Sequence, residues 1–477
     1  MFFLVFIAVI STSYAQSPGG VPNTKMTLWY SGDHGVDDTG KLTWDDRSPN
    51  DNHAEQPTAS EKAVQTNLFN FNETFTFNGS SNRFAISRLN YTNGQSLSDL
   101  SMFVVYATNF SRTSYDGNWS FLDFDRSRSF NFYIHGNGRL AMSYQSGGTQ
   151  DLVANTVSND GIPHMATYLF DNNDAIDGPI TNESVMRLDG FEDYTGNNTT
   201  TDIAVSANRY GFIGDGSEAS SFNGSKNNIY YDGDIAEIIF YDKGDLGTDD
   251  IKKIESYLAL KYGITMDVGS TSYVNSSNVA VWDDTSYWNG VAGIIQDHTG
   301  AINQKVAKSN DYENFVVAMD NDYASSNSAV SRTSVRDGKS LVFGHNNAAD
   351  GFSAFGGAGS DYLFRKTWLF QEKNGDVGNV FIAMDKSVFT GETVDLIVSS
   401  DATFDGGDSR YDMTEGATHY YVEVNIPNNS YVSFVMTQTS KGPGGVIGGL
   451  ELWFRSDTGV TADGSAVSNV TDQTFQG

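Results

Sequence analysis

The sequence contains no cysteine, so it can form no disulfide bond and has no thiol nucleophile. Basic residues are scarce: 29 lysines and arginines stand against 59 aspartates and glutamates, a formal net charge of −30. A chain this acidic repels phosphate backbones and anionic lipids, which argues against binding to nucleic acid or directly to a membrane. Beyond residues 2–10, no stretch approaches the ~18 apolar residues of a membrane-spanning helix.

The one apolar run, residues 2–10, is too short to cross a bilayer and is followed by Ser13-Tyr14-Ala15. The small residues Ser13 and Ala15, at the two positions that a signal peptidase reads, predict an export signal over residues 1–15, cleaved before Gln16. No basic residue precedes the run, so either the signal is atypical or Met1 is an internal methionine. An exported chain without cysteine, with domains large enough to rely on their cores, is typical of bacteria. We expect a secreted protein, extracellular or on the outer surface of a bacterium.

The 48 glycines, 13% aromatic residues and many short alternating runs predict an all-β chain whose strands are joined by turns. Two blocks, residues 21–265 and 266–440, are each large enough for a core of their own. The alternation in the first block suits a β-sandwich. Strands are predicted in the first block at 101–107, 130–135, 164–170, 210–213 and 235–241, and in the second at 315–319, 340–344, 368–371, 379–384, 394–399, 420–426 and 431–436.

One helix is predicted at the end of the first block. Thr248 is the candidate N-cap, and Asp249-Asp250 follow at the positive end of the helix dipole. Lys261 falls in the last turn, and Gly263 suits the position after the helix end. The residues at helical spacing, which we expect to pack on a sheet edge, are Ile251, Ile254 and Leu258.

An internal repeat links the two ends of the chain. Pro18-Gly19-Gly20-Val21 recurs as Pro443-Gly444-Gly445-Val446, and Leu28-Trp29-Tyr30 recurs as Leu452-Trp453-Phe454. Residues 441–477 are therefore predicted to be the truncated start of a second copy of the first block. We expect further copies of this unit along the full protein, as neighbours of the same chain.

These residues resemble known families. Leu28-Trp29, residues 44–52 and residues 232–241 make the first block similar to the concanavalin A-like, laminin-G-like jelly-roll domains of secreted bacterial proteins. Residues 254–265 resemble the segment that ends such domains in Bacteroidetes surface proteins. Through Arg365-Lys366-Thr367-Trp368, among others, the second block resembles the uncharacterised domain that commonly follows there. The resemblance implies a jelly-roll sandwich with one C-terminal helix and a second β-sandwich-like domain, as part of a repeat-containing adhesin.

No catalytic site is expected in this chain. Glucanases of the resembled fold carry Glu-x-Asp-x-(x)-Glu, and the nearest match begins with Asp232-x-Asp234. Glu237, which would complete it, points away from Asp234 unless a bulge intervenes. We interpret Asp232-Gly233 as a turn and Glu237 as a strand residue with a structural partner. The 7 histidines show no metal-binding spacing, and His164 is interpreted as structural.

A polar loop over residues 113–120 is the candidate glycan site. Tyr115, Asp116 and Trp119 combine aromatic rings with a carboxylate, which is typical of sugar recognition on loops. Trp29 and Trp44 are assigned instead to the core of the sandwich.

A second polar segment, residues 171–178, is the candidate calcium site. Its oxygen ligands are dense and include a turn glycine, but the spacing is not that of an EF-hand. A hydrophilic hairpin tip is the alternative interpretation. The predicted ligands are Asp171, Asn173, Asp174 and Asp177, and Ca²⁺ is the only cofactor expected.

Taken together, the sequence predicts a secreted or cell-surface binding module, non-catalytic in itself, that recognises a polysaccharide or surface glycan for adhesion. Two alternatives stay open. The chain could be an accessory carbohydrate-binding region of a larger glycoside hydrolase, or a structural stalk in which the repeats only add length.

Overall fold

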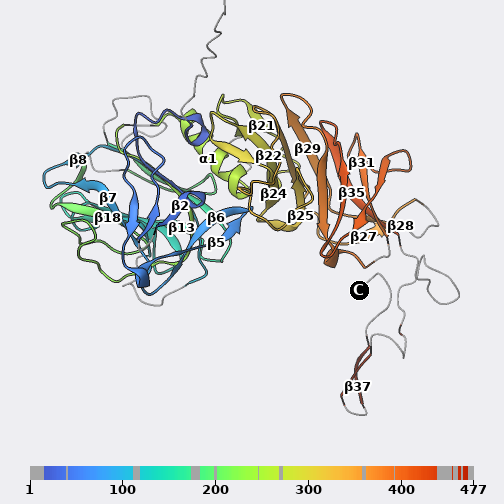
Figure 1. Ribbon diagram of the computed structural model, residues 1–477, viewed down its shortest axis with the longest axis horizontal. Helices are drawn as coiled ribbons and strands as arrows, with labels where there is room; N and C mark the ends of the chain where they lie inside the picture. Colours follow the sequence, from blue (N-terminus) through green and yellow to red (C-terminus); the bar gives the residue numbers. More distant parts are fainter. Residues whose placement is uncertain are drawn as a thin grey trace, which may run out of the picture.

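The structure is a computed structural model, and most of the chain from Gln16 onward is described. Figure 1 shows two β-rich units with the helix α1 (Thr248–Tyr262) between them. The predicted all-β fold class is confirmed, and α1 is the only α-helix in the described part of the chain. The described residues are 16–38, 41–110, 119–172, 183–197, 201–244, 246–267, 272–356, 361–390, 393–437, 454, 460–463 and 466–470.

The first unit is a sandwich of two antiparallel sheets, which we call sheets I and II. Sheet I has the order β16 (Phe191–Asn197), β15 (Glu183–Leu188), β14 (His164–Asp171), β9 (Asp99–Ala107), β19 (Asp232–Tyr241), β6 (Asn72–Asn78) and β5 (Val64–Phe69), with β1 (Met26–Ser31) also on β19. Sheet II has the order β13 (Thr149–Val157), β12 (Arg139–Gln145), β11 (Phe130–Ile134), β10 (Trp119–Asp123), β18 (Arg209–Ile213), β7 (Phe84–Tyr91), β4 (Ala54–Gln56), β3 (Lys41–Trp44) and β2 (Gly35–Asp38). The short strands β8 (Ser96–Leu97) and β17 (Ile203–Ala204) pair with each other.

Sheet I is buried on both faces, one against sheet II and the other against α1. Because strand side chains alternate between the two faces, neighbouring residues belong to different cores. Val104 of β9 points into the core between sheets I and II, while its neighbour Val105 points to the opposite face, toward α1. Trp44 lies in the core between the sheets, as predicted, and its indole nitrogen donates to the carbonyl of Ser31 at 2.8 Å. Trp29 is also buried, but on the other face of sheet I against α1, so its assignment to the core between the sheets was wrong.

The second unit also stacks two sheets around a core, sheets III and IV. Sheet III has the order β23 (Ile302–Gln304), β22 (Asn289–Asp297), β26 (Ser340–His345), β29 (Trp368–Lys373), β35 (Ser430–Thr437), β28 (Asp361–Phe364) and β27 (Phe352–Ala354), extended by β31 (Thr393–Ser399) and β32 (Ser409–Asp412). Sheet IV has the order β24 (Val306–Ser309), β25 (Tyr312–Ala318), β30 (Val380–Asp385), β34 (His419–Val424) and β33 (Thr414–Glu415). The strands β20 (Tyr273–Val274) and β21 (Ala280–Trp282) form a separate pair.

Across both units, the described residues also form short 3₁₀ helices: η1 (Pro18–Gly20), η2 (Gly32–His34), η3 (Ala59–Glu61) and η4 (Lys386–Val388).

The helix α1 lies between two sheet faces and not on a sheet edge, which corrects the prediction. Its predicted apolar stripe shares one buried cluster with Trp29 of sheet I and with Val342 of sheet III. The end at Gly263 is as predicted, with a left-handed φ of 67°. The start is one residue earlier, because the carbonyl of Gly247 accepts the first helical bond, from Ile251 at 3.0 Å, and makes Gly247 the N-cap.

Amide side chains join α1 and the two units. Asn70 donates to the carbonyls of Leu260 and Lys261 at 3.2 and 3.1 Å, which satisfies acceptors left open at the end of the helix. Its side-chain oxygen accepts from the backbone of Lys308 in the second unit at 2.7 Å. Gln304 of β23 donates in turn to the carbonyl of Asn70 at 2.9 Å. The two units are therefore held in contact by buried hydrogen bonds as well as by the apolar cluster.

The described part of the chain ends in the hairpin β36 (Val460–Asp463) and β37 (Ala466–Val470), which lies apart from both units in Figure 1. The repeat aligns Val460 with Val36, the second residue of β2. The hairpin thus falls where the first copy has its own antiparallel hairpin, β2–β3.

Candidate functional site

The acidic residues of β19 lie on one face of sheet I. Asp232 and Gly233 belong to the strand, which corrects their interpretation as a turn. The pairing with β9 slips by one residue between Ile235 and Glu237, so a bulge is present. Asp234 and Glu237 consequently pair with Ala107 and Val105, which both face α1.

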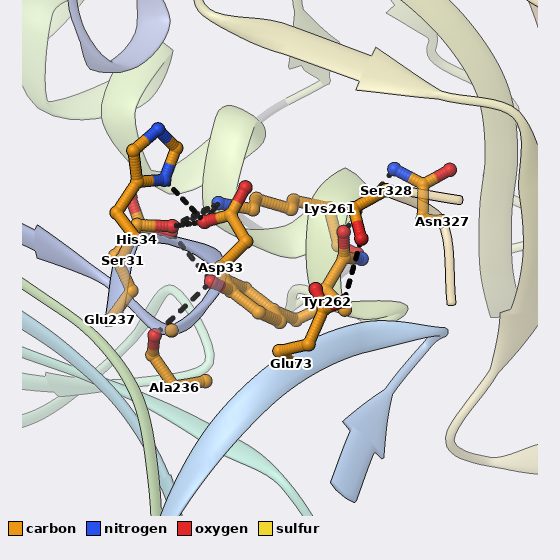
Figure 2. A network of polar contacts seen from close by, with 12 residues as sticks. Ser31, Asp33, His34, Glu73, Ala236, Glu237, Lys261, Tyr262, Asn327 and Ser328 are labelled. Atoms are coloured by element: carbon orange, nitrogen blue, oxygen red, sulfur yellow. Dashed lines mark hydrogen bonds and ion pairs between the residues drawn. The ribbon is translucent and has the colours of Figure 1, made fainter. Parts of the chain in front are cut away.

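The carboxylate of Glu237 is enclosed by donors and is 0% exposed. One oxygen accepts from the Trp29 indole at 2.7 Å and from the Tyr257 hydroxyl at 2.8 Å. The other accepts from Lys261 at 2.8 Å and from Tyr262 at 2.6 Å. Figure 2 shows Lys261 reaching from α1 toward this group. The structural partner predicted for Glu237 is confirmed, and no face of its carboxylate is open to a ligand.

His164 is also structural, as predicted. Its Nδ1 lies 2.7 Å from Asp189 and its Nε2 lies 3.2 Å from Asp160. Burial lowers the pKa of His164, but the hydrogen bond and charge of Asp189, joined by Asp160, outweigh burial and raise the pKa to about 9. An imidazole held charged between two carboxylates is a poor general base near neutral pH.

Trp119 is not an exposed platform for a sugar. It begins β10 opposite Ile134, and both side chains face the core of the sandwich. Its ring is 1% exposed and packs edge-to-face on Phe110, with the centroids 5.4 Å apart. The prediction was wrong because its polar sequence neighbours suggested a loop, whereas strand alternation turns the indole inward. Tyr115 and Asp116 lie outside the described residues.

Of the four predicted calcium ligands, Asp171 alone is described. It ends β14 and is 1% exposed. Asn173, Asp174 and Asp177 lie outside the described residues. Within the part of the chain that is described, no group of three or more histidines, aspartates or glutamates could hold a metal ion. The calcium site stays a prediction.

A polar cavity of about 370 Å³, which we call the sheet-face cavity, lies on the outer face of sheet II. Its floor comes from β10 and β11, and its walls come from the turn between these strands and from the segment that joins β18 to β19. The lining residues are Ser120, Asp123, Asp125, Arg126, Ser127, Asn131, Gly216, Glu218, Asn227 and Ile229.

Strand pairing places the floor residues. Asp123 of β10 pairs with Asn131 of β11, and Ser120 pairs with Tyr133, so all four side chains project to the outer face. A register shift between Ser120 and Leu122 keeps both Ser120 and Asp123 on this face although they are three residues apart.

Buried hydrogen bonds hold the wall against the sheet. One carboxylate oxygen of Asp215 accepts from the backbone nitrogens of Gly216 and Ile229, at 2.7 and 2.9 Å. Asp123 accepts from the backbone nitrogen of Ser217 at 3.1 Å, which joins the wall to the floor. The cavity is therefore built from fixed backbone on both sides.

Two carboxyl groups in and beside the cavity have raised pKa values. Burial raises the pKa of Asp123 well above its usual value, against the opposing hydrogen bonds from Ser217 and Asp125. Burial likewise raises the pKa of Asp215 to about 6. Asp125, which also lines the cavity, forms an ion pair with Arg209 at 2.7 Å. A carboxyl that keeps its proton to higher pH can donate a hydrogen bond as well as accept one.

Two buried polar atoms of the floor have no partner within the described part of the protein. They are the hydroxyl of Ser120 and the side-chain oxygen of Asn131, whose residues are 0% and 2% exposed. Buried polar atoms in native proteins are almost always hydrogen-bonded, because an unpaired one costs ~1–3 kcal/mol. Both residues line the cavity, so a polar ligand or water there could satisfy them.

Sequence reasoning missed this site because its residues look like ordinary outward positions of strands. One signal was available. Polar residues stand at paired outward positions on four consecutive strands, in the order Asp123, Asn131, Ser143 and Asp151. The register that aligns them across the sheet is a property of the fold, not of any one strand.

Comparison with known proteins adds a family match for the second unit. Residues 250–430 match a family described as a domain of unknown function (DUF8202), in line with the expectation that the second block is an uncharacterised domain. The matched range includes most of α1. No curated protein matches the chain.

Several solved structures share a coarse similarity with the chain. Domain 4 of AbnA, an extracellular arabinanase from Geobacillus stearothermophilus in complex with arabinotriose, is 14% identical and covers 49% of this chain and 98% of its own, with a TM-score of 0.33. The CBM40 of the Ruminococcus gnavus IT-sialidase, bound to α2,3 sialyllactose, is 14% identical, covers 36% and 96%, and has a TM-score of 0.25. The binding domain of Paraclostridial Mosquitocidal Protein 1 is 9% identical, covers 84% and 92%, and has a TM-score of 0.37. Separately, the described residues include no helix long and apolar enough to cross a membrane.

Proposed function

We propose that this chain is a carbohydrate-binding module and that the sheet-face cavity holds the sugar. The observation that carries the proposal is the pair of unpartnered buried atoms on the floor, Ser120 Oγ and Asn131 Oδ1, within the described part of the chain. Buried polar atoms without hydrogen-bond partners lower the stability of a folded protein. Proteins often accept this cost at binding sites, where a bound ligand supplies the missing hydrogen bonds.

The lining suits a ligand that is covered with hydroxyl groups. Sugar hydroxyls both donate and accept, and the cavity offers carboxylates, amides and hydroxyls in alternation, with Ile229 as the only large apolar side chain among the described lining residues. A volume of about 370 Å³ lies at the lower end of ligand pockets, which run from ~300 to ~1,000 Å³. Asp125 is already paired with Arg209, and Glu218 is matched by Arg126, so the described lining has no excess of positive charge that would attract an acidic sugar, which favours a neutral one.

The wider setting proposed is export and display on a cell surface. Residues 1–15 would direct export, and copies of the unit would follow one another along the chain for adhesion to a polysaccharide. Tyr115 and Asp116 precede β10 by a few residues and stay predicted contributors to glycan binding, as the segment around Asp174 does to calcium binding. The module would serve equally as an accessory region of a larger glycoside hydrolase.

A glycan array followed by titration calorimetry tests the proposal. The purified chain is screened against neutral oligosaccharides, and the best ligand is titrated into the wild type and into Ser120→Ala and Asn131→Ala. Each substitution should weaken binding about tenfold, the effect of one lost hydrogen bond to a ligand. Asn90→Ala, on β7 of the same sheet and outside the cavity lining, is the matched control and should bind normally.

Stability separates a binding role from a structural one. Removing an unpaired buried hydroxyl relieves a cost, so Ser120→Ala should unfold at the same urea concentration as the wild type or at a higher one. Weaker binding without loss of stability supports the proposal. If no neutral glycan binds a correctly folded chain, the proposal fails and the structural stalk is the better account.

A further inference from the structure

A second cavity, of about 310 Å³, lies where the two units meet at the end of α1, and we call it the interunit cleft. The first unit contributes η2 and the segment around Arg47, α1 contributes Lys261, and the second unit contributes the β22–β23 hairpin with the segments around Lys305 and Asn327. Figure 2 shows Asp33, His34 and Lys261 facing Asn327 and Ser328 across this region.

The charge of the cleft is opposite to that of the chain. Its described lining includes three cations, Arg47, Lys261 and Lys305, and a single carboxylate, Asp33. The chain as a whole has 59 acidic and 29 basic residues, so a set of lining residues with average composition would contain about twice as many carboxylates as cations. An excess of positive charge in a concave site concentrates the field there and attracts anions.

Lys261 is already compensated by the protein. Its ammonium lies 2.8 Å from Glu237 and 3.9 Å from Asp33. Burial opposes ionisation of Asp33, but the charge of Lys261 and the neighbouring His34 outweigh it and hold the pKa of Asp33 well below its usual value. These charges balance one another, so Lys261 leaves little attraction for an external anion.

Arg47 and Lys305 are not compensated in this way. The guanidinium of Arg47 lies 3.7 Å above the ring of Trp29, which fixes its plane while leaving its N–H groups available. Neither Arg47 nor Lys305 forms an ion pair with any described carboxylate. Burial and the nearby guanidinium of Arg332 lower the pKa of Lys305 and together outweigh the opposing charge of Asp320.

We propose that the interunit cleft binds the anionic group, a carboxylate or a sulfate, of an acidic saccharide, with Arg47 and Lys305 as its direct contacts. The planar fork of an arginine matches both groups with two parallel hydrogen bonds. The neutral lining favours a saccharide over an acidic peptide. It offers amide, imidazole and hydroxyl groups for sugar hydroxyls, and only Ala301 and Ile302 as apolar contacts among the described residues.

This site is separate from the sheet-face cavity, which lies on the outer face of sheet II, whereas the cleft lies beyond sheet I. The two sites would select different sugars, since the described lining of the cleft has an excess of cations and that of the sheet-face cavity has none. The failure of one proposal leaves the other standing.

The test is a titration of the whole chain with three probes at constant ionic strength: glucose, glucuronate and glucose 6-sulfate. With the sheet-face cavity weakened by Ser120→Ala/Asn131→Ala, glucuronate or the sulfate should bind at least about tenfold more tightly than glucose, because hydrogen bonds to a charged group are roughly twice as strong as neutral ones. Comparing the two acidic probes tells which anion the cleft prefers.

Arg47→Gln and Lys305→Gln should each weaken acidic binding about tenfold and leave neutral binding unchanged. Arg365→Gln, an exposed arginine of the second unit outside the cleft lining, is the matched control.

Two results would overturn the proposal. One is that glucose binds Ser120→Ala/Asn131→Ala as tightly as both acidic probes do, or that the double variant Arg47→Gln/Lys305→Gln keeps wild-type affinity for the acidic probes. The other is that Ser120→Ala/Asn131→Ala abolishes acidic binding, which would place the anion in the sheet-face cavity. Circular dichroism and the thermal midpoint of each variant show that a loss of binding is not a loss of folding.

Discussion

The buried pair of Glu237 and Lys261 makes a strong prediction about stability. Glu237 would complete the acidic pattern that Asp232 and Asp234 begin on β19, yet its carboxylate has four protein donors and no exposed surface. Lys261→Met keeps the apolar stem and removes the ammonium. Glu237→Gln keeps the shape and removes the charge, but its new amide donor would face the donors Lys261 or Tyr262.

The magnitude follows from burial. Removing one partner of a buried ion pair leaves the other charge uncompensated in a medium of low dielectric, which costs ~3–5 kcal/mol. We expect Lys261→Met to lose about this much stability and Glu237→Gln somewhat less, since Lys261 keeps Asp33 at 3.9 Å. In the double variant no buried charge of the pair is left, so its loss should be smaller than the sum of the two by ~2 kcal/mol or more.

Urea unfolding at pH 7, followed by circular dichroism, measures these changes, with Arg88→Met as the control. Arg88 pairs with Asp51 at 3.3 Å on the surface, and its loss should change stability by no more than ~0.5 kcal/mol. The reasoning is refuted if each buried single variant costs less than ~1 kcal/mol, or if the two losses simply add.

Two further predictions concern His164 and the start of the chain. The pKa of His164 is raised from 6.5 to about 9 in the folded state. Its contribution to the free energy of unfolding is therefore complete below pH 6.5 and is lost as the pH rises through 9. Urea unfolding between pH 6 and 9.5 should show a decline of up to ~3 kcal/mol that His164→Asn abolishes, and an equal decline in the variant would disprove this origin. Gly19→Ala should cost ~1–3 kcal/mol in the same assay, because Gly19 has a φ of 62° and an added Cβ would lie 2.5 Å from the backbone of Lys253 in α1. The control Gly147→Ala has a similar φ of 65° with open space around it, and an equal cost at both positions would show that the contact with α1 is unimportant.

Local signals in the sequence predicted α1 and most central strands well. The helix has acidic residues at its start, a stripe at helical spacing and Gly263 at its end, and all of these act within a few residues of one another. Its environment could not be predicted in the same way. The stripe suggested one partner, but the helix is buried on two sides, against sheets I and III, and residues such as Ser256 and Tyr257 are buried outside the stripe.

The candidate site could not be predicted because it depends on register. Trp119 and Ser120 are adjacent in the sequence, yet one faces the core and the other lines the sheet-face cavity. Which of the two points outward is decided by the pairing of β10 with β11 and by the register shift after Ser120. The wall, with Glu218 and Asn227, comes from about a hundred residues further along the chain, so nothing local connects it to the floor.

Hydrogen exchange on the whole chain, with and without the neutral oligosaccharide that binds best, tests most directly whether a sugar occupies the sheet-face cavity. Ligand contact with the floor and wall should slow the exchange of backbone amides in residues 119–134 and 214–231. The same ligand should leave these amides unprotected in Ser120→Ala/Asn131→Ala. Protection confined to the second unit, or equal protection in the double variant, would contradict a sugar site on sheet II.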